Sequence, residues 1–213
     1  MTPLWRQIFK SSGILLAYAF VGTAILAAVY AMTHTAIEKN DADAQRKLVA
    51  ETLIPHSYNN DLIASAVHLP RNNLLGNDAK PAQGWQARMN QTPIAIVLPV
   101  TAPNGYGGAI QLLVGISNDG QITGVRVVEH HETPGLGDYI DIAKSQWIHI
   151  FDGKSLRNTP DEAWQVKKDG GEFDYVTGAT ITPRAVIAAV HRALQYASKY
   201  HTQLFAPATG AKP

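Results

Sequence analysis

The sequence predicts an α+β protein in which one N-terminal transmembrane helix precedes a largely antiparallel sheet domain covered by helices. An uncharged apolar run from Gly13 to Met32 predicts the membrane helix. Two β-rich segments flank Asn118-Asp119-Gly120, which indicates an antiparallel hairpin. An amphipathic stretch from Pro183 to about His201 predicts a helix whose apolar side packs on the sheet.

Composition limits the size and the chemistry of the molecule. Its 213 residues suit one ordinary domain with attachments. The 18 Lys and Arg residues nearly balance the 17 Asp and Glu residues, so no basic field is available to bind a nucleic acid. The chain has no cysteine, which excludes disulfides, iron–sulfur clusters, Cys-ligated zinc and a Cys nucleophile.

The N-terminal apolar run is long enough to cross a bilayer. Residues 13–32 would span about 30 Å as a helix. Arg6 and Lys10 precede the run, which favours residues 1–12 as a cytoplasmic tail and the bulk of the chain outside. The alternative is a cleaved signal peptide, but the run is longer than the usual h-region of roughly 7–15 residues. The length therefore favours an uncleaved anchor.

The segments that follow are assigned in order along the chain. Residues 33–54 are polar with helical character and predict a stalk that continues the membrane helix until Pro55 ends it. Residues 55–205 are expected to form the extracytoplasmic domain, and residues 206–213 a disordered tail. Within the domain, residues 56–92 are expected to form short elements and loops. Ile94–Leu98 is expected to form a short strand.

The sheet domain is expected to contain two hairpins and a C-terminal helix. The first hairpin joins Gly108–Ser117 to Gln121–Glu129, and residues 138–150 between the hairpins look helical or mixed. A second hairpin would pair residues 164–168 with residues 172–176. For the helix, Thr182 suits the N-cap and Pro183 suits the first helical position. Its apolar stripe consists of Val186, Val190, Leu194 and Ala197.

The strongest candidate site is the segment Asp174-Tyr175-Val176-Thr177-Gly178-Ala179-Thr180. A strand is expected to run into a tight turn that opens the C-terminal helix. Backbone N–H groups at a helix start are unpaired and favour an anion. The Thr180 hydroxyl would lie at that positive end, while Gly178 and Ala179 leave room for a bulky group. This predicts a phosphate site beside a hydroxyl, whereas the alternative is an ordinary turn whose threonines cap the helix.

A second candidate is the segment Glu132-Thr133-Pro134-Gly135-Leu136-Gly137. Gly135 and Gly137 would let the backbone approach a flat ligand closely. Leu136 could lie against a ring face, and Thr133 could meet polar ligand atoms. The alternative is a proline-glycine turn that closes the end of a hairpin.

Other polar residues are weaker candidates. Adjacent histidines in an extended segment point to opposite faces, so His130 and His131 predict no metal site. Lys144 could balance the charge of a phosphate-bearing ligand, although a helix lysine is more often solvated. Arg184 could contact a phosphate or simply face solvent, and Trp147 is expected in the core.

The motif residues together resemble a known family. The pattern Asp-x-x-Thr-Gly-Ala-Thr at 174–180, the upstream Glu-Thr-Pro-Gly-Leu-Gly at 132–137 and the N-terminal membrane helix resemble the FMN-binding G subunit of the Rnf/Rsx ion-translocating electron transport complex. The C subunit of the sodium-translocating NADH:quinone oxidoreductase represents a sister family that shares the Ser/Thr-Gly-Ala-Thr element. The resemblance covers essentially the whole chain, including Gly105-Tyr106-Gly107-Gly108.

The resemblance implies a cofactor and a mode of attachment. It implies that Thr180 carries FMN through a phosphoester bond made by a separate flavin transferase, and that Asp174 belongs to the sequence which the transferase recognises. The remaining cofactor-binding candidates come from the two glycine segments and from Lys144. These candidates are Thr177, Gly178, Ala179, Glu132, Thr133, Gly135, Leu136, Gly137 and Lys144.

Two functions from different classes follow. The resemblance implies an electron-transfer subunit of an ion-translocating oxidoreductase in the bacterial inner membrane, with its domain in the periplasm and other membrane subunits as partners. No standalone turnover is expected, and no ion pathway, because the membrane span has no ionisable residue. The alternative is a tethered, noncatalytic module that binds a phosphate-bearing ligand reversibly. A hydrolase is disfavoured because no nucleophile–base pair stands out.

Overall fold

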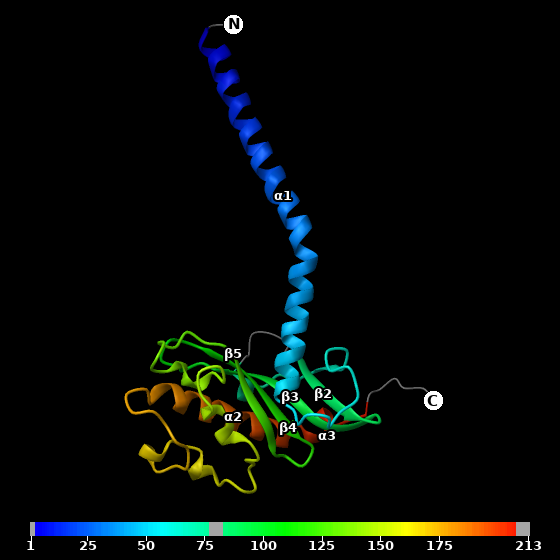
Figure 1. The fold of residues 1–213 in the computed structure, drawn as a ribbon, viewed down its shortest axis with the longest axis vertical. Coiled ribbons are helices and arrows are strands. Elements are labelled where there is room, and N and C mark those ends of the chain that lie inside the picture. Colours follow the sequence, from blue (N-terminus) through cyan, green and yellow to red (C-terminus); the bar gives the residue numbers. More distant parts are fainter. Residues whose placement is uncertain (1–2, 77–82, 208–213) are drawn as a thin grey trace. The chain divides into compact units, whose positions relative to one another are not determined.

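The computed structural model describes residues 3–76 and 83–207, which divide into two compact units. The first unit is Met1–Gln45 and the second is Arg46–Pro213. The expected tail at residues 206–213 lies outside the described residues from residue 208 onward. The first unit is helical, and the second contains the sheet and the other helices (Figure 1).

One long helix, α1 (Pro3–Glu51), forms the first unit and continues along the chain into the second (Figure 1). Its segment Ile8–His34 is long and apolar enough to cross a membrane. The helix continues without a break through the predicted stalk. It ends at Glu51, and the hydroxyl of Thr52 donates a 2.7 Å hydrogen bond to the carbonyl of Val49. The helix therefore stops before Pro55, which was expected to end it.

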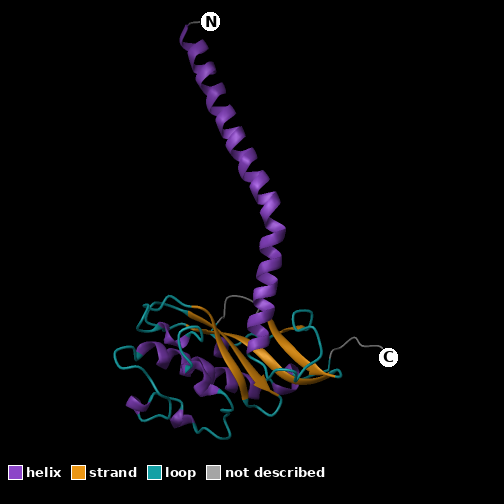
Figure 2. Cartoon of the chain, viewed as in Figure 1, coloured by secondary structure: helices purple, strands orange, loops and turns teal. Residues whose placement is uncertain are grey.

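The second unit is built on a five-stranded antiparallel sheet in which each strand pairs with the next along the chain (Figure 2). This confirms the predicted fold class. The strands are β1 (Ala66–His68), β2 (Gln83–Met89), β3 (Thr92–Ala102), β4 (Ile110–Ser117) and β5 (Ile122–Glu129).

The predicted β4–β5 hairpin is confirmed, and the other strands depart from expectation. Gly120 has φ +83° in the hairpin turn, a conformation that glycine adopts without strain. The strand predicted at Ile94–Leu98 is part of the longer β3, which contains both flanking prolines. Pro93 pairs with Arg88 beside an irregularity in β2, where a missing N–H is tolerated. Strand β2 falls in a region expected to form short elements and loops.

Both faces of the sheet are buried. Alternate residues of β3 point to opposite sides. Ile96 and Leu98 join a core with helix α2 (Ile181–Lys199), whereas Val97 joins a second core with the end of α1. Figures 1 and 2 show α2 running across the sheet, and the short helix α3 (His201–Leu204) follows it. The predicted apolar stripe of α2 is fully part of the first core.

The N-terminus of α2 differs from the sequence prediction. The helix begins at Ile181, so Thr180 is the N-cap and the assignment of Thr182 as N-cap is wrong. Thr182 is buried, and its hydroxyl donates to the carboxylate of Glu132. Pro183 still lies in the first turn, where its missing N–H leaves no hydrogen bond unmade.

The predicted second hairpin is wrong. Residues 161–173 contain two short 3₁₀ helices, η4 (Asp161–Ala163) and η5 (Lys167–Asp169), and a single parallel bridge from Val166 to Phe173. The rings of Trp164 and Phe173 lie 5.1 Å apart in the core, so burial holds this loop in place of strand pairing. The expected strand entering the Thr180 motif is therefore absent from the described residues. Residues 138–151 form two more 3₁₀ helices, η2 (Asp138–Ile140) and η3 (Trp147–Phe151).

Candidate functional site

The two glycine-containing segments predicted as candidate sites meet at one cavity of about 300 Å³. Residues from both segments line it, together with Tyr106 and the first residues of α2. The lining is Tyr106, Glu132, Thr133, Leu136, Gly137, Gly178, Ala179, Thr180, Ile181 and Thr182. A cavity of this volume lies at the lower end of the range of cofactor sites, so it can enclose part of a flavin nucleotide.

Thr180 occupies the position that the sequence analysis singled out. It is half-buried at the start of the 19-residue helix α2, with φ −81° and ψ −24°. Its hydroxyl makes no capping hydrogen bond to the helix. The hydroxyl therefore lies beside the positive end of a long helix without being used to satisfy that end.

The turn before Thr180 leaves space for a ligand. Gly178 has φ +93°, which disfavours any other residue, and no atom lies within 4 Å of the position that a Cβ would take. The N–H of Ala179 donates to the carbonyl of Val176 at 3.1 Å, which closes the turn. The opening above Gly178 is therefore a consequence of the backbone geometry.

Two aromatic residues support this turn from within the domain. The Trp147 indole donates a 2.7 Å hydrogen bond to the carbonyl of Asp174, and the Tyr139 hydroxyl accepts one of 3.4 Å from the N–H of Val176. Their rings meet edge to face at 5.3 Å. Burial raises the pKa of Tyr139, and the charge of Glu132 acts in the same direction. Tyr139 therefore remains a neutral phenol at physiological pH.

Glu132 connects the cavity wall to two other segments. Its side chain is only 5% exposed. The Oε1 atom accepts a 3.0 Å hydrogen bond from the N–H of Gly107, and Oε2 accepts one from the Thr182 hydroxyl. The N–H of Glu132 donates to Nδ1 of His130 at 3.1 Å, so His130 supports the loop. No group of three potential metal-ligating side chains occurs in the described part of the chain.

Four of the predicted site residues lie outside the lining. Thr177 is exposed in the turn, and the N–H of Gly135 donates to the Asp138 carboxylate at 2.8 Å. Asp174 points to solvent and pairs with Lys167 at 2.6 Å. Lys144 is exposed in a turn after η2. Exposure makes Thr177 and Asp174 accessible to another protein.

Arg184 lies in the first turn of α2 but is already paired. Its guanidinium donates two hydrogen bonds, of 2.6 and 2.7 Å, to the Asp169 carboxylate. These hydrogen bonds lower the pKa of Asp169 and raise the pKa of Arg184. The structure therefore uses this arginine to fix the η5 loop against α2.

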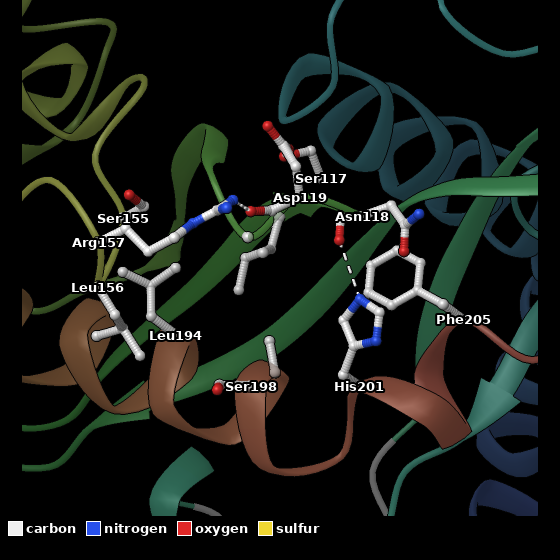
Figure 3. A pocket seen from close by; sticks show the side chains of 13 residues that line it. Ser117, Asn118, Asp119, Ser155, Leu156, Arg157, Leu194, Ser198, His201 and Phe205 are labelled. Carbon is white, nitrogen blue, oxygen red and sulfur yellow. Dashed lines mark hydrogen bonds between the residues drawn. The ribbon is translucent and has the colours of Figure 1, made fainter.

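A second cavity, of about 410 Å³, lies near the β4–β5 turn and the end of α2 (Figure 3). Its polar side chains bind one another: Arg157 donates to the carbonyl of Asp119, and the His201 ring is 2.9 Å from the carbonyl of Asn118. A hydrogen bond from Ser117 lowers the pKa of Asp119. None of the residues predicted to bind a cofactor lines this cavity.

Ile181 and Thr182 are site residues that the sequence analysis did not assign. Ile181 is 47% exposed although it is a large aliphatic residue. Thr182 was assigned to a helix cap because local rules favour threonine there. Its partner Glu132 is 50 residues away, so no local pattern could reveal the contact.

The fold and the site define a class of protein. An apolar helix able to cross a membrane is joined to a sheet domain, and that domain has an anion-favouring helix end, an uncommitted hydroxyl and a glycine-lined cavity. These features define a membrane-anchored domain that holds a phosphate-bearing cofactor.

Comparison with known proteins gives the family. Residues 105–195 match the model of the FMN-binding domain, and residues 1–51 match the RnfG N-terminal region. The chain is 46% identical over 206 residues to the G subunit of the ion-translocating oxidoreductase complex of Pseudomonas aeruginosa, covering 97% of this chain and 96% of the relative. The Cronobacter sakazakii protein of the same name is 46% identical, with 98% and 99% covered, and that of Vibrio cholerae is 43% identical, with 92% and 93% covered.

The chain therefore belongs to the RnfG family, the G subunits of Rnf-type ion-translocating oxidoreductase complexes. Its cofactor is FMN, and it is an electron-transfer subunit that acts with the other subunits of its complex. This confirms the predicted family, function and cofactor, and it decides against the noncatalytic binding module.

Proposed function

We propose that this chain carries its FMN as a phosphoester of the Thr180 hydroxyl. The observation that supports the proposal is the Thr180 hydroxyl, which makes no capping bond and lines the cavity formed by the two motifs. The esterified phosphate would keep a negative charge beside the unpaired N–H groups of α2. Bound FMN supplies one- and two-electron redox chemistry.

The other residues have separate tasks in this proposal. Gly178 leaves the opening through which the flavin enters, and Leu136 and Tyr106 line the wall with apolar surface. Tyr139 and Trp147 hold the turn so that Thr180 keeps its position relative to the cavity. Lys144, which is exposed outside the lining, would act on the cofactor only through its charge.

We also propose that a separate flavin transferase attaches the FMN. The acceptor segment suits recognition by another protein because Asp174 is exposed before the turn and Thr177 is exposed within it. The side chain of Asp174 is 69% exposed and its partner Lys167 is 57% exposed, so a transferase could replace this ion pair at small cost.

The domain is placed on the periplasmic side of the bacterial inner membrane in this proposal. The support is Arg6 and Lys10, which precede an uncharged span. Protease added to intact spheroplasts should then digest the domain without first opening the membrane. Digestion only after the membrane is opened would contradict this orientation.

In-gel flavin fluorescence tests the attachment site. The full chain is co-expressed with a flavin transferase as wild type, Thr180→Ala and Thr202→Ala, and run on a denaturing gel. We expect fluorescent bands for wild type and for Thr202→Ala, the control at an exposed threonine of α3 outside the cavity, and a dark band for Thr180→Ala. A fluorescent Thr180→Ala band, or a dark wild-type band with a transferase active on another substrate, would refute the ester at Thr180.

A further inference from the structure

A buried carboxylate lies in the wall of the FMN cavity without a cationic partner. Glu132 is 5% exposed, and both of its oxygens accept hydrogen bonds, from Gly107 and from Thr182. No Lys, Arg or His nitrogen lies within 4.0 Å of this carboxylate among the side chains that the structure describes. A buried charge that is not paired usually has a function, because burying it costs free energy.

The surrounding glycines show that the chain is built around this side chain. A Cβ at Gly105 would lie 2.8 Å from Oε1 of Glu132, and a Cβ at Gly137 would lie 2.5 Å from Oε2. A Cβ at Gly107 would lie 1.9 Å from the carbonyl of His131. The backbone at Gly105 and at Gly137 thus approaches the carboxylate more closely than a residue with a side chain permits, and Gly107 approaches the backbone of the neighbouring His131 in the same way.

We propose that Glu132, through its negative charge, lowers the reduction potential of the FMN in this cavity. The inference rests on the proposed function, since it places the flavin of Thr180 in the cavity that Glu132 lines. Reduction adds negative charge to a flavin. A fixed negative charge in the same poorly solvated wall opposes that added charge and therefore favours the oxidised form.

Glutamine can replace Glu132 without charge because its side chain can form hydrogen bonds with the same two partners. In Glu132→Gln, the amide oxygen can accept from the N–H of Gly107, and the amide nitrogen can donate to the hydroxyl of Thr182. The variant keeps the shape and both contacts and removes only the charge. Glu129→Gln is the matched control because Glu129 is an exposed carboxylate on β5 that does not line the cavity.

The experiment is a potentiometric titration of the full chain, solubilised and loaded with FMN. Loading is measured first by in-gel fluorescence, so a failure of the proposed ester is seen separately from a failure of this inference. We expect Glu132→Gln to make flavin reduction at least tenfold more favourable, which is 59 mV for a one-electron step. The increase should persist at high salt, because a buried charge is poorly screened. Glu129→Gln should change the equilibrium less than twofold.

A second variant keeps the test decisive if Glu132→Gln fails to load. Thr182→Val removes the hydroxyl that donates to the carboxylate but keeps the charge, so it should make reduction less favourable, opposite in sign to Glu132→Gln. A merely structural role predicts lost thermal stability in both variants with no change of potential. The inference is overturned if loaded Glu132→Gln titrates within twofold of wild type, or if Thr182→Val leaves the potential unchanged or raises it.

Discussion

At Gly137 a side chain would have to displace its neighbours in the cavity wall, although the backbone conformation would allow one. The residue has φ −88°, so an alanine there causes no backbone strain. Its Cβ would nevertheless lie 2.5 Å from Glu132 and 2.9 Å from the Thr182 hydroxyl. The glycine is therefore required by the contact between the loop and the first turn of α2.

Gly137→Ala should separate this loop from α2. We expect the domain to lose about 1–3 kcal/mol of unfolding free energy, the usual cost of overpacking, and to lose much of its FMN loading. Chemical denaturation and in-gel fluorescence measure the two effects. Leu136→Ala is the control, since Leu136 is 49% exposed and its truncation should leave stability nearly unchanged. Equal stability of Gly137→Ala and wild type would contradict the observed packing.

Residue patterns in the sequence predicted which segments line the cavity, but they did not predict the contacts between those segments. Both glycine segments were identified because glycine and threonine at a helix start have local physical meaning. The carboxylate–hydroxyl contact of Glu132 with Thr182 depends on chain folding across 50 residues. Local rules could therefore identify Glu132 as a candidate but could not name its partner.

At the scale of elements, a pair of glycines joins the end of α1 to the sheet. Gly115 of β4 pairs with Gly124 of β5, and the fully buried Thr52 lies against both. A Cβ at Gly115 would lie 2.2 Å from the Thr52 carbonyl oxygen, and a Cβ at Gly124 would lie 3.0 Å from it. That carbonyl also accepts a 2.6 Å hydrogen bond from Thr123.

The two glycines should differ in their tolerance of alanine. Gly115→Ala should lower the unfolding free energy by about 1–3 kcal/mol, and Gly124→Ala by less, since its Cβ has more room. Urea denaturation of the two variants gives the comparison. A larger loss for Gly124→Ala, or no loss for either variant, would contradict the contact with Thr52.

Helix α2 carries a pH-sensitive side chain that does not line the cavity at its N-terminus. The His191 ring stacks on Trp164 with centroids 4.9 Å apart, and its Nε2 is 3.1 Å from the Asp161 carboxylate. Burial lowers the pKa of His191 below 6.5, which outweighs the opposing effect of Asp161. The folded state therefore favours the neutral ring, and the unfolded chain binds the proton more tightly.

Stability should consequently fall with pH in a defined window. The contribution of His191 is complete above pH 6.5 and is lost as the pH falls toward the lower pKa of the folded state. Thermal midpoints measured across this window should fall more steeply for wild type than for His191→Gln, in which no ring can be protonated. Parallel pH curves for the two proteins would show that this histidine does not titrate as described.

Helices and strands were predicted correctly where the pattern of neighbouring residues was enough to define them. The Asp-Gly turn between two β-rich runs gave β4 and β5, and apolar periodicity gave α2. Strand β2 was missed because Gln86, which is 1% exposed, interrupts the apolar pattern; its amide donates to the carbonyl of Leu204 from α3. The second hairpin was predicted wrongly because β-rich residues flank a glycine turn. Several of these residues, including Trp164, Val166 and Phe173, are instead buried in the first core without forming paired strands.

At the scale of the whole molecule, the chain divides at a point inside α1. The second unit begins at Arg46, and its second core includes Val49 from the end of α1 and Leu53, which follows the helix. The last turns of this helix therefore belong to the FMN-binding unit, whereas the sequence placed them in a separate stalk. The sequence could identify the apolar span by composition alone, but the extent of the domain depends on contacts with the sheet.

Two truncations should show whether the end of α1 belongs to the sheet-containing unit or to a separate stalk. A chain beginning at Arg46 should leave the membrane and keep the thermal midpoint of the full-length domain. A chain beginning at His56 loses the buried apolar side chains of Val49 and Leu53, worth about 1.5–3 kcal/mol each, together with the buried Thr52, so it should melt at a lower temperature. Calorimetry and membrane fractionation check both outcomes, and identical midpoints would show that the end of α1 does not stabilise the sheet.

The measurement that tests the central claim most directly is mass spectrometry of proteolytic peptides from the purified full chain. The account predicts that the peptide containing Thr180 is heavier by the mass of FMN less one water, and that fragmentation assigns the added mass to Thr180 and not to Thr177. An unmodified Thr180 peptide from protein that keeps its yellow colour would contradict the account, because the FMN would then be held in another way.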